Sequence, residues 1–217
     1  MKANPMLHLQ RIMRQLAMTA AVLTVLIGAS LTLSISLSYL IDPDAYAEFF
    51  GSRDPDGVRR PILLLHVCGG TAALVLGALQ LLLRRSGRPD RRHRIVGWLY
   101  ATSVCAGASG ALAIAPFSLG GATNAAGFGL LGLIWAGVTA TGIVQGLFRD
   151  PAVHRRWMIL SYALTCAAIS LRLQLAIFQA ALGLSYAASY TIVAWSCWVP
   201  NLAIAVWVQF CRKRAGP

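Results

Sequence analysis

Charged residues are scarce in this chain. Only 12% of its 217 residues are Asp, Glu, Lys or Arg, whereas 57% are hydrophobic and the mean hydropathy is +0.64. A soluble globular domain carries charge on about a quarter of its residues. The composition therefore excludes an ordinary soluble domain and indicates a membrane protein.

Several signatures of soluble enzymes are also missing. The sequence contains no G-x-S-x-G elbow, Walker loop, H-E-x-x-H motif or dinucleotide-binding fingerprint. Its 5 cysteines stand singly in apolar segments, which argues against a disulfide framework or a thiolate zinc site. Hydrolase chemistry is poorly supported, and the sequence leaves open whether the protein is an enzyme.

Basic residues outnumber acidic ones, giving a formal net charge of +12, but they cluster at the ends of apolar stretches. No basic helix or polar face with interleaved aromatic residues is available to bind a phosphate backbone. We therefore expect the lipid bilayer as a partner and no nucleic acid.

Long apolar stretches recur along the chain, each about the 20 residues needed to cross a bilayer. They are Ala17–Ile41, Ile62–Leu83, Ile95–Pro116, Gly121–Phe148, Trp157–Leu182 and Ala187–Cys211. The expected fold is an all-α bundle of six transmembrane helices. Its parts would be an N-terminal arm (1–16), a first helix (17–41), an external loop (42–61), a five-helix core (62–211) and a tail (212–217).

The charges of the connections predict the orientation. Arginines precede the first stretch, crowd the connections 84–94 and 149–156, and follow the last stretch, whereas the other connections carry few uncompensated basic residues. Cytoplasmic loops carry an excess of Lys and Arg, so we expect both termini in the cytoplasm.

Two hairpins of the predicted bundle resemble each other. In each, a glutamine and an arginine end one helix, and a His-Arg pair, at His93 or His154, begins the next. This pattern suggests a parallel repeat, with both histidines at cytoplasmic helix starts. One interpretation is ligation of a cofactor, haem b in particular. The other, which we favour, is interfacial anchoring beside arginines and tryptophans.

Arg172 lies inside the fifth apolar stretch, and every Asp and Glu of the chain lies outside the apolar stretches. An arginine at such a position marks either a structural pairing or a functional site. By helical rise, Ser196 on the sixth helix lies at about the same depth. Its carbonyl loses a helical partner because Pro200 has no N–H. In the structural interpretation, Arg172 satisfies this proline-broken helix.

In the functional interpretation, Arg172 holds an anionic or carbonyl-bearing ligand, because its planar guanidinium offers several donors and keeps its charge. His66 would enter the site from the second helix, Tyr190 and Trp195 would form apolar walls, and Asn201 would add a polar group at the kink. We give the two interpretations equal weight.

From His66 to its end, the chain resembles a bacterial membrane-protein family, domain of unknown function 2306. The resemblance lies in the segments HVCGGTAALVLGALQ (66–80), HRIVGWLY (93–100), HRRWMILSYALT (154–165), Leu171-Arg172 and CWVPNL (197–202). It covers about two thirds of the chain. It implies a six-helix bacterial membrane protein with no established biochemical activity. We expect this protein in the inner membrane.

These observations lead to one favoured function and two alternatives. The favoured function is a redox-related membrane protein that binds haem or a quinone-like molecule within the bundle. The first alternative is a non-enzymatic transporter or assembly factor that recognises an anionic or lipid-like ligand through Arg172. The second is a scaffold whose residues serve only packing. The sequence predicts neither a particular ligand nor an oligomeric state.

Overall fold

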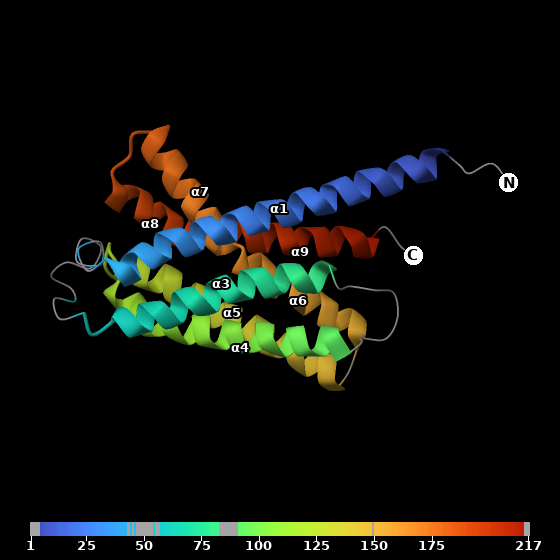
Figure 1. The fold of residues 1–217 in the computed structure, drawn as a ribbon, viewed down its shortest axis with the longest axis horizontal. Helices are drawn as coiled ribbons and strands as arrows, with labels where there is room; N and C mark the ends of the chain where they lie inside the picture. The colour runs from blue at the N-terminus through green and yellow to red at the C-terminus, as the bar shows by residue number, and fades with distance from the viewer. Residues whose placement is uncertain are drawn as a thin grey trace.

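The computed structural model describes residues 5–42, 44, 46, 54, 57–82, 91–148 and 150–214. Every regular element in these ranges is a helix (Figure 1). The helices are α1 (Pro5–Ile41), α3 (Arg60–Leu82), α4 (Arg91–Ile114), the short 3₁₀ helix η2 (Ala115–Phe117), α5 (Ala122–Phe148), α6 (Pro151–Thr165), α7 (Ala167–Ala180), α8 (Tyr186–Ser196) and α9 (Val199–Arg214).

Five helical segments of the described chain are long and apolar enough to cross a membrane. They are Arg60–Leu81, Arg91–Phe117, Ala122–Phe148, Pro151–Ala180 and Tyr186–Gln209, whereas the apolar part of α1, Val22–Ile35, is shorter. The expected all-α membrane bundle is therefore confirmed. The crossing by α1, the compartment of the termini and the duplication of the hairpins stay predictions.

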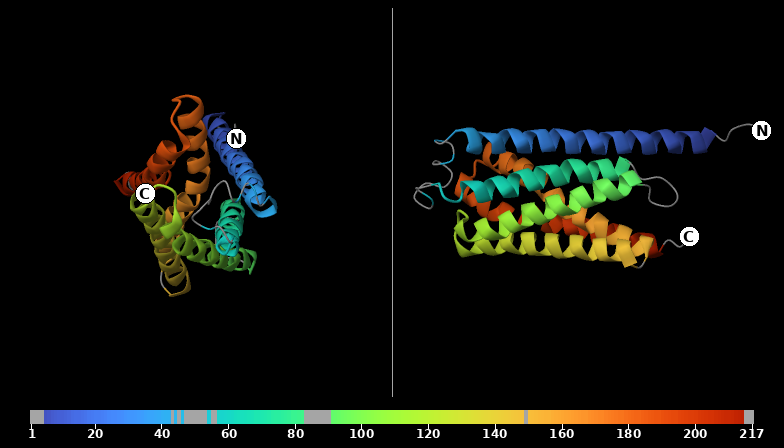
Figure 2. Two further views of the ribbon diagram at one scale, coloured as in Figure 1. Left: turned by 90° about the vertical axis from the view of Figure 1, so that its left-hand side faces the viewer. Right: turned by 60° about the horizontal axis from the view of Figure 1, so that its bottom comes forward.

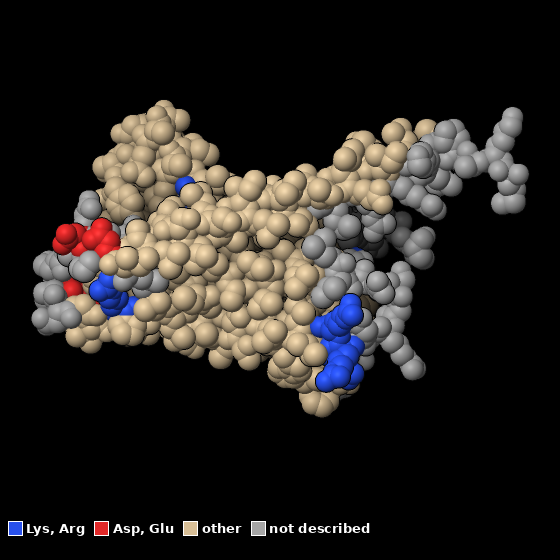
Figure 3. Space-filling model, in the orientation of Figure 1, with Lys and Arg blue, Asp and Glu red and all other residues tan. Residues whose placement is uncertain are grey.

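The helices run roughly along one axis and stand around a common centre (Figure 2). α1 begins and α9 ends at the same end of the bundle, which we call the terminal end (Figure 1). α1 has 37 residues and extends beyond the other helices at this end. On the face drawn in Figure 3, charged side chains gather at the two ends and the belt between them is nearly all uncharged.

Two neighbouring segments of the bundle are broken near their middles. Pro200 accounts for the break between α8 and α9, because it cannot donate a hydrogen bond to the carbonyl of Ser196. The break between α6 and α7 falls at Cys166, and α7 contains no proline that could cause it. There the carbonyl of Cys166 accepts from the N–H groups of both Ile169 (3.0 Å) and Ser170 (3.1 Å). Beyond these breaks, α7 and α8 lean away from the rest of the bundle (Figure 1).

α3 and α4 pack closely because glycines face each other between them. A Cβ built on Gly69 would lie 2.5 Å from the backbone nitrogen of Gly107, and one on Gly110 would lie 2.7 Å from the backbone nitrogen of His66. Small residues allow such backbone contact between membrane helices. The contact holds the backbone of His66 in place.

Candidate ligand-binding site

A cavity of about 190 Å³ lies within the bundle. Its walls come from α1, α3, α4, η2, α5, α6, α7 and α8, so it occupies the space next to the two helix breaks. The wall is largely apolar and includes Phe128, Trp135 and Tyr190. Polar side chains also reach it, among them His66, Thr71, Thr165 and Arg172.

Arg172 enters the cavity wall from α7 and is half-buried. Its Nη1 donates to the carbonyl oxygen of Ala168, one turn earlier, at 2.9 Å. The Ser196 carbonyl that Pro200 leaves without a helical partner accepts from Nε2 of Gln174 at 3.1 Å. The hydroxyl of Ser196 in turn donates to Oε1 of Gln174 at 2.6 Å. Gln174, which sequence reasoning had not considered, therefore supplies a partner for the broken helix.

His66 reaches the same cavity from α3. Its Nδ1 lies 2.8 Å from the carbonyl oxygen of Gly107. A carbonyl oxygen only accepts hydrogen bonds, so Nδ1 carries the proton. In the neutral ring, Nε2 is then a hydrogen-bond acceptor. The structure thus brings His66 and Arg172 to one cavity, on different helices.

The other three predicted ligand-binding residues are placed differently from one another. Tyr190 lines the cavity, and its ring centroid lies 5.2 Å from that of Phe128. Trp195 lies outside the cavity lining, 37% exposed. Asn201 is also outside it, and its Nδ2 donates to Oγ of Ser170 at 3.0 Å, which links α9 to α7.

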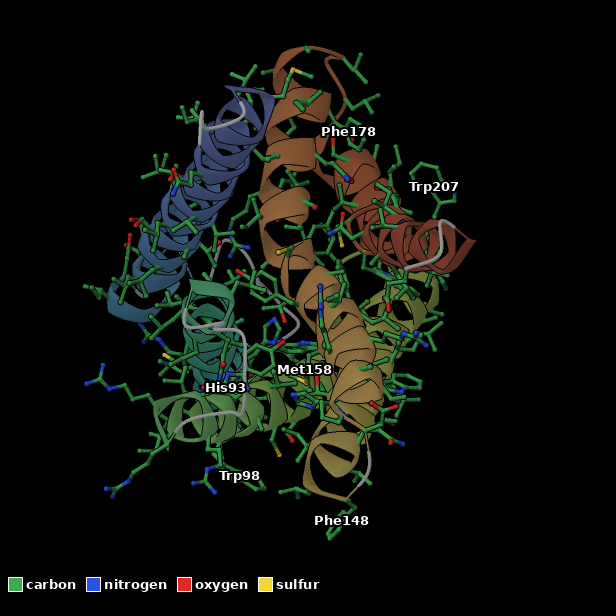
Figure 4. The ribbon with its side chains drawn as sticks, turned by 90° about the vertical axis from the view of Figure 1, so that its right-hand side faces the viewer. His93, Trp98, Phe148, Met158, Phe178 and Trp207 are labelled. Atoms are coloured by element: carbon green, nitrogen blue, oxygen red, sulfur yellow. The ribbon has the colours of Figure 1, made fainter. Side chains whose placement is uncertain are left out.

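The two histidines predicted as cofactor ligands lie in the first turns of α4 and α6, and both are outside the cavity lining. Both helices begin at the terminal end (Figure 1). His93 lies where α3 and α4 meet, and its carbonyl accepts from Nε2 of Gln80 at 2.7 Å (Figure 4). Nδ1 of His154 lies 2.6 Å from the carbonyl oxygen of Gly142 on α5. Each histidine thus lies at a contact between two consecutive helices. Side chains of Trp98, Phe148 and Trp207 at this end point away from the bundle (Figure 4).

A buried network of hydroxyl groups lies beside the cavity, and sequence reasoning missed it. The hydroxyl of Tyr100 lies 2.7 Å from Oγ of Ser161 and 2.9 Å from Oγ1 of Thr165. Ser161 also contacts Oγ1 of Thr139 at 2.6 Å, and Nε1 of Trp135 donates to Thr165 at 2.9 Å. Trp135 and Thr139 are four residues apart, as are Ser161 and Thr165, so each pair lies on one face of its helix. This spacing is the signal in the sequence that could have shown two polar faces in contact.

A compact polar cluster lies at the other end of the bundle, beside the rim of the cavity. Asp54 is buried, accepts from the hydroxyl of Tyr46, and pairs with Nη1 of Arg59 at 2.9 Å. The guanidinium carbon of Arg59 lies 3.7 Å from the ring centroid of Phe117, which lines the cavity. Burial opposes ionisation of Asp54, but the bonds from Tyr46 and Arg59 outweigh it and hold the pKa of the carboxyl below its usual value.

The fold and its apolar segments define an all-helical, multi-pass membrane protein. The chain belongs to the family described as predicted membrane protein (DUF2306), whose model matches residues 63–209. This match confirms the family that the sequence motifs indicated. No curated protein and no solved structure matches the chain.

Proposed function

We propose that this protein holds a small carbonyl-bearing ligand of the quinone type in its bundle cavity. The observation that carries the proposal is the convergence of the Arg172 guanidinium and the His66 imidazole on one largely apolar cavity. An apolar pocket with a few placed polar groups is the usual form of a small-molecule site.

The size of the cavity supports a ligand with a single ring. An engineered cavity of about 150 Å³ in another protein binds benzene. The cavity here has a volume of about 190 Å³, which suits one substituted ring. A haem, with four pyrrole rings, is much larger. Because His93 and His154 do not line this cavity, the haem hypothesis draws no support from it.

The polar groups suit a ring that carries an oxygen. A guanidinium has five N–H donors in one plane, so Arg172 can hold the carbonyl of Ala168 and a ligand oxygen together. Nε2 of His66 can accept from a hydroxyl, such as that of a reduced quinone. A carbonyl compound and its hydroxyl form could therefore use the same site.

We further propose that α1 crosses the membrane as a sixth helix and that both termini lie in the cytoplasm of a bacterial cell, in the inner membrane. Basic residues at the terminal end of the bundle support this orientation, because cytoplasmic segments carry an excess of Lys and Arg. Arg91, Arg92 and Arg94 begin α4, and Arg155 and Arg156 lie in the first turns of α6. Fusion of reporter enzymes to each terminus tests it, and a terminus that reports from outside the cytoplasm contradicts it.

The charge of Arg172 favours a second candidate, a transporter or assembly factor for an anionic, lipid-like molecule. Arginine binds carboxylates through paired hydrogen bonds, and the permanent charge of Arg172 would attract such a group. The two candidates share one site and differ in the chemistry of the ligand.

Calorimetric titration of the detergent-purified protein distinguishes the candidates. The probes are tetramethyl-1,4-benzoquinone, which has no free ring position for thiol addition, and decanoate. Binding of the quinone that is lost in Arg172→Gln supports the first candidate, and binding of decanoate alone supports the second. Arg156→Gln, an exposed arginine on α6, is the matched control and should bind as the wild type does. If neither the quinone nor decanoate binds, both candidates are contradicted.

A further inference from the structure

Thr71 stands apart from the other buried or half-buried threonines of the bundle. Threonine in a helix commonly donates to the carbonyl four residues earlier. Thr32, Thr139, Thr141, Thr165 and Thr191 all do so here, at distances between 2.7 and 3.1 Å. The hydroxyl of Thr71 is buried and makes no hydrogen bond with any part of the chain that the structure describes.

The position of Thr71 explains where a partner for this hydroxyl could lie. Thr71 is 9% exposed, and it lines the same cavity as His66 and Arg172. A buried hydroxyl without a partner is unfavourable, so buried polar groups normally have one. Because Thr71 lines the cavity, a small turn of its side chain would present this hydroxyl to a polar atom of a molecule inside it.

Thr71 and Arg172 line the cavity from different helices. Thr71 lies on α3 and Arg172 on α7, and the cavity is lined by both helices. His66 precedes Thr71 by about 7.5 Å along α3, at a rise of 1.5 Å per residue. A ligand in the cavity therefore has a cation from α7 and a hydroxyl and an imidazole from α3 around it.

From this arrangement we infer that the cavity takes a ligand with two oxygens on opposite sides of its ring, and that Thr71 binds the second oxygen. The inference rests on the proposed function, because it names the second anchor of the same site. Arg172 donates to one oxygen, and the hydroxyl of Thr71 donates to the other. A 1,4-quinone has this disposition of oxygens. When the second oxygen is a hydroxyl, as in the reduced form, Thr71 can accept from it instead.

Two probes with the same carbon skeleton test the inference by calorimetric titration. Tetramethyl-1,4-benzoquinone has two oxygens, and 2,3,5,6-tetramethylphenol has one. Loss of a neutral hydrogen bond weakens binding by about three- to tenfold. We expect Thr71→Val, which keeps the shape of the side chain, to weaken binding of the quinone by this factor. Binding of the phenol should change by less than about twofold, because only Arg172 is needed for its single oxygen.

Further variants separate this inference from the proposed function. Thr71→Ser restores the hydroxyl and should restore affinity for the quinone, whereas Arg172→Gln should weaken both probes. An equal effect of Thr71→Val on both probes, or no effect on either, overturns the role of Thr71. The proposed function still stands in that case if Arg172→Gln weakens binding of both probes. If the wild-type protein binds neither probe, the inference and the proposed function both fail.

Discussion

Gly69 and Gly70 are neighbours on α3, yet they face two different kinds of space. A Cβ on Gly69 would meet the backbone of Gly107 at 2.5 Å, whereas a Cβ on Gly70 would have nothing within 4 Å. Gly70 lines the cavity, and Gly69 does not. One face of α3 is therefore closed against α4, and the adjacent face is open to a ligand.

The polar groups of the bundle show the same difference. The hydroxyls of Tyr100, Ser161, Thr139 and Thr165 bond to one another and to backbone carbonyls. The hydroxyl of Thr71 has no such partner among the described residues. A satisfied network fixes how helices pack, whereas an unsatisfied group on a cavity wall is available to a bound molecule. The comparison separates polar residues that serve packing from those we assign to binding.

The largest effect is expected at the closed face of α3. Gly69→Ala forces α3 and α4 apart, because the new methyl group would meet the backbone of Gly107. We expect the free energy of unfolding to fall by about 1–3 kcal/mol. Thermal denaturation in detergent measures the change. Gly70→Ala is the matched control, and equal melting temperatures for the two variants would contradict the difference between the faces.

A smaller loss of stability is expected within the hydroxyl network. Ser161→Ala removes a partner from both Tyr100 and Thr139, so the free energy of unfolding should fall by about 1–2 kcal/mol. Affinity for tetramethyl-1,4-benzoquinone should stay unchanged. Ser109→Ala, on the exposed side of α4, serves as the control and should melt as the wild type does. A loss of quinone binding in Ser161→Ala would show that the network takes part in the site.

Filling the open face should affect binding alone. Gly70→Leu places a side chain in the cavity, and we expect binding of the quinone to weaken by about tenfold, which corresponds to about 1.4 kcal/mol. The melting temperature should not fall. Gly137→Leu is a fitting control, because Gly137 on α5 is also open and does not line the cavity. Unchanged titration of Gly70→Leu would place the ligand elsewhere.

The smallest effect is expected at the rim of the cavity. The pKa of Asp54 is held below its usual value of 3.8, so the cluster's contribution to stability is complete above that pH and is lost as the pH falls through the lowered pKa. A fluorophore on Val58→Cys, which is exposed, reports the mobility of this segment by anisotropy. We expect anisotropy to fall only at low pH in the otherwise wild-type protein. With Asp54→Asn added, it should be low throughout, and a steady high value would contradict the role of the cluster.

Several parts of the fold and the site could be predicted from the sequence. The apolar stretches predicted the membrane segments, and Pro200 predicted the break before α9. The depth of His66 and Arg172 along their helices was consistent with their meeting at one cavity. Which polar side chains at one depth bond to each other could not be predicted. Gln174 donates to the Ser196 carbonyl, and Asn201 bonds to Ser170. Such contacts depend on how each helix is turned about its axis, which the sequence does not specify.

By itself, the sequence determined that this chain is a helical membrane protein and at what depth its polar residues lie. Both follow from the length of apolar segments and a rise that is the same in every helix. The tertiary structure alone decided which polar groups meet. Lipid and helix surfaces are about equally apolar, so hydrophobicity does not specify how a membrane helix is rotated. Close contacts such as that between Gly69 and Gly107 fix the rotation, and with it the open face that carries His66 and Thr71.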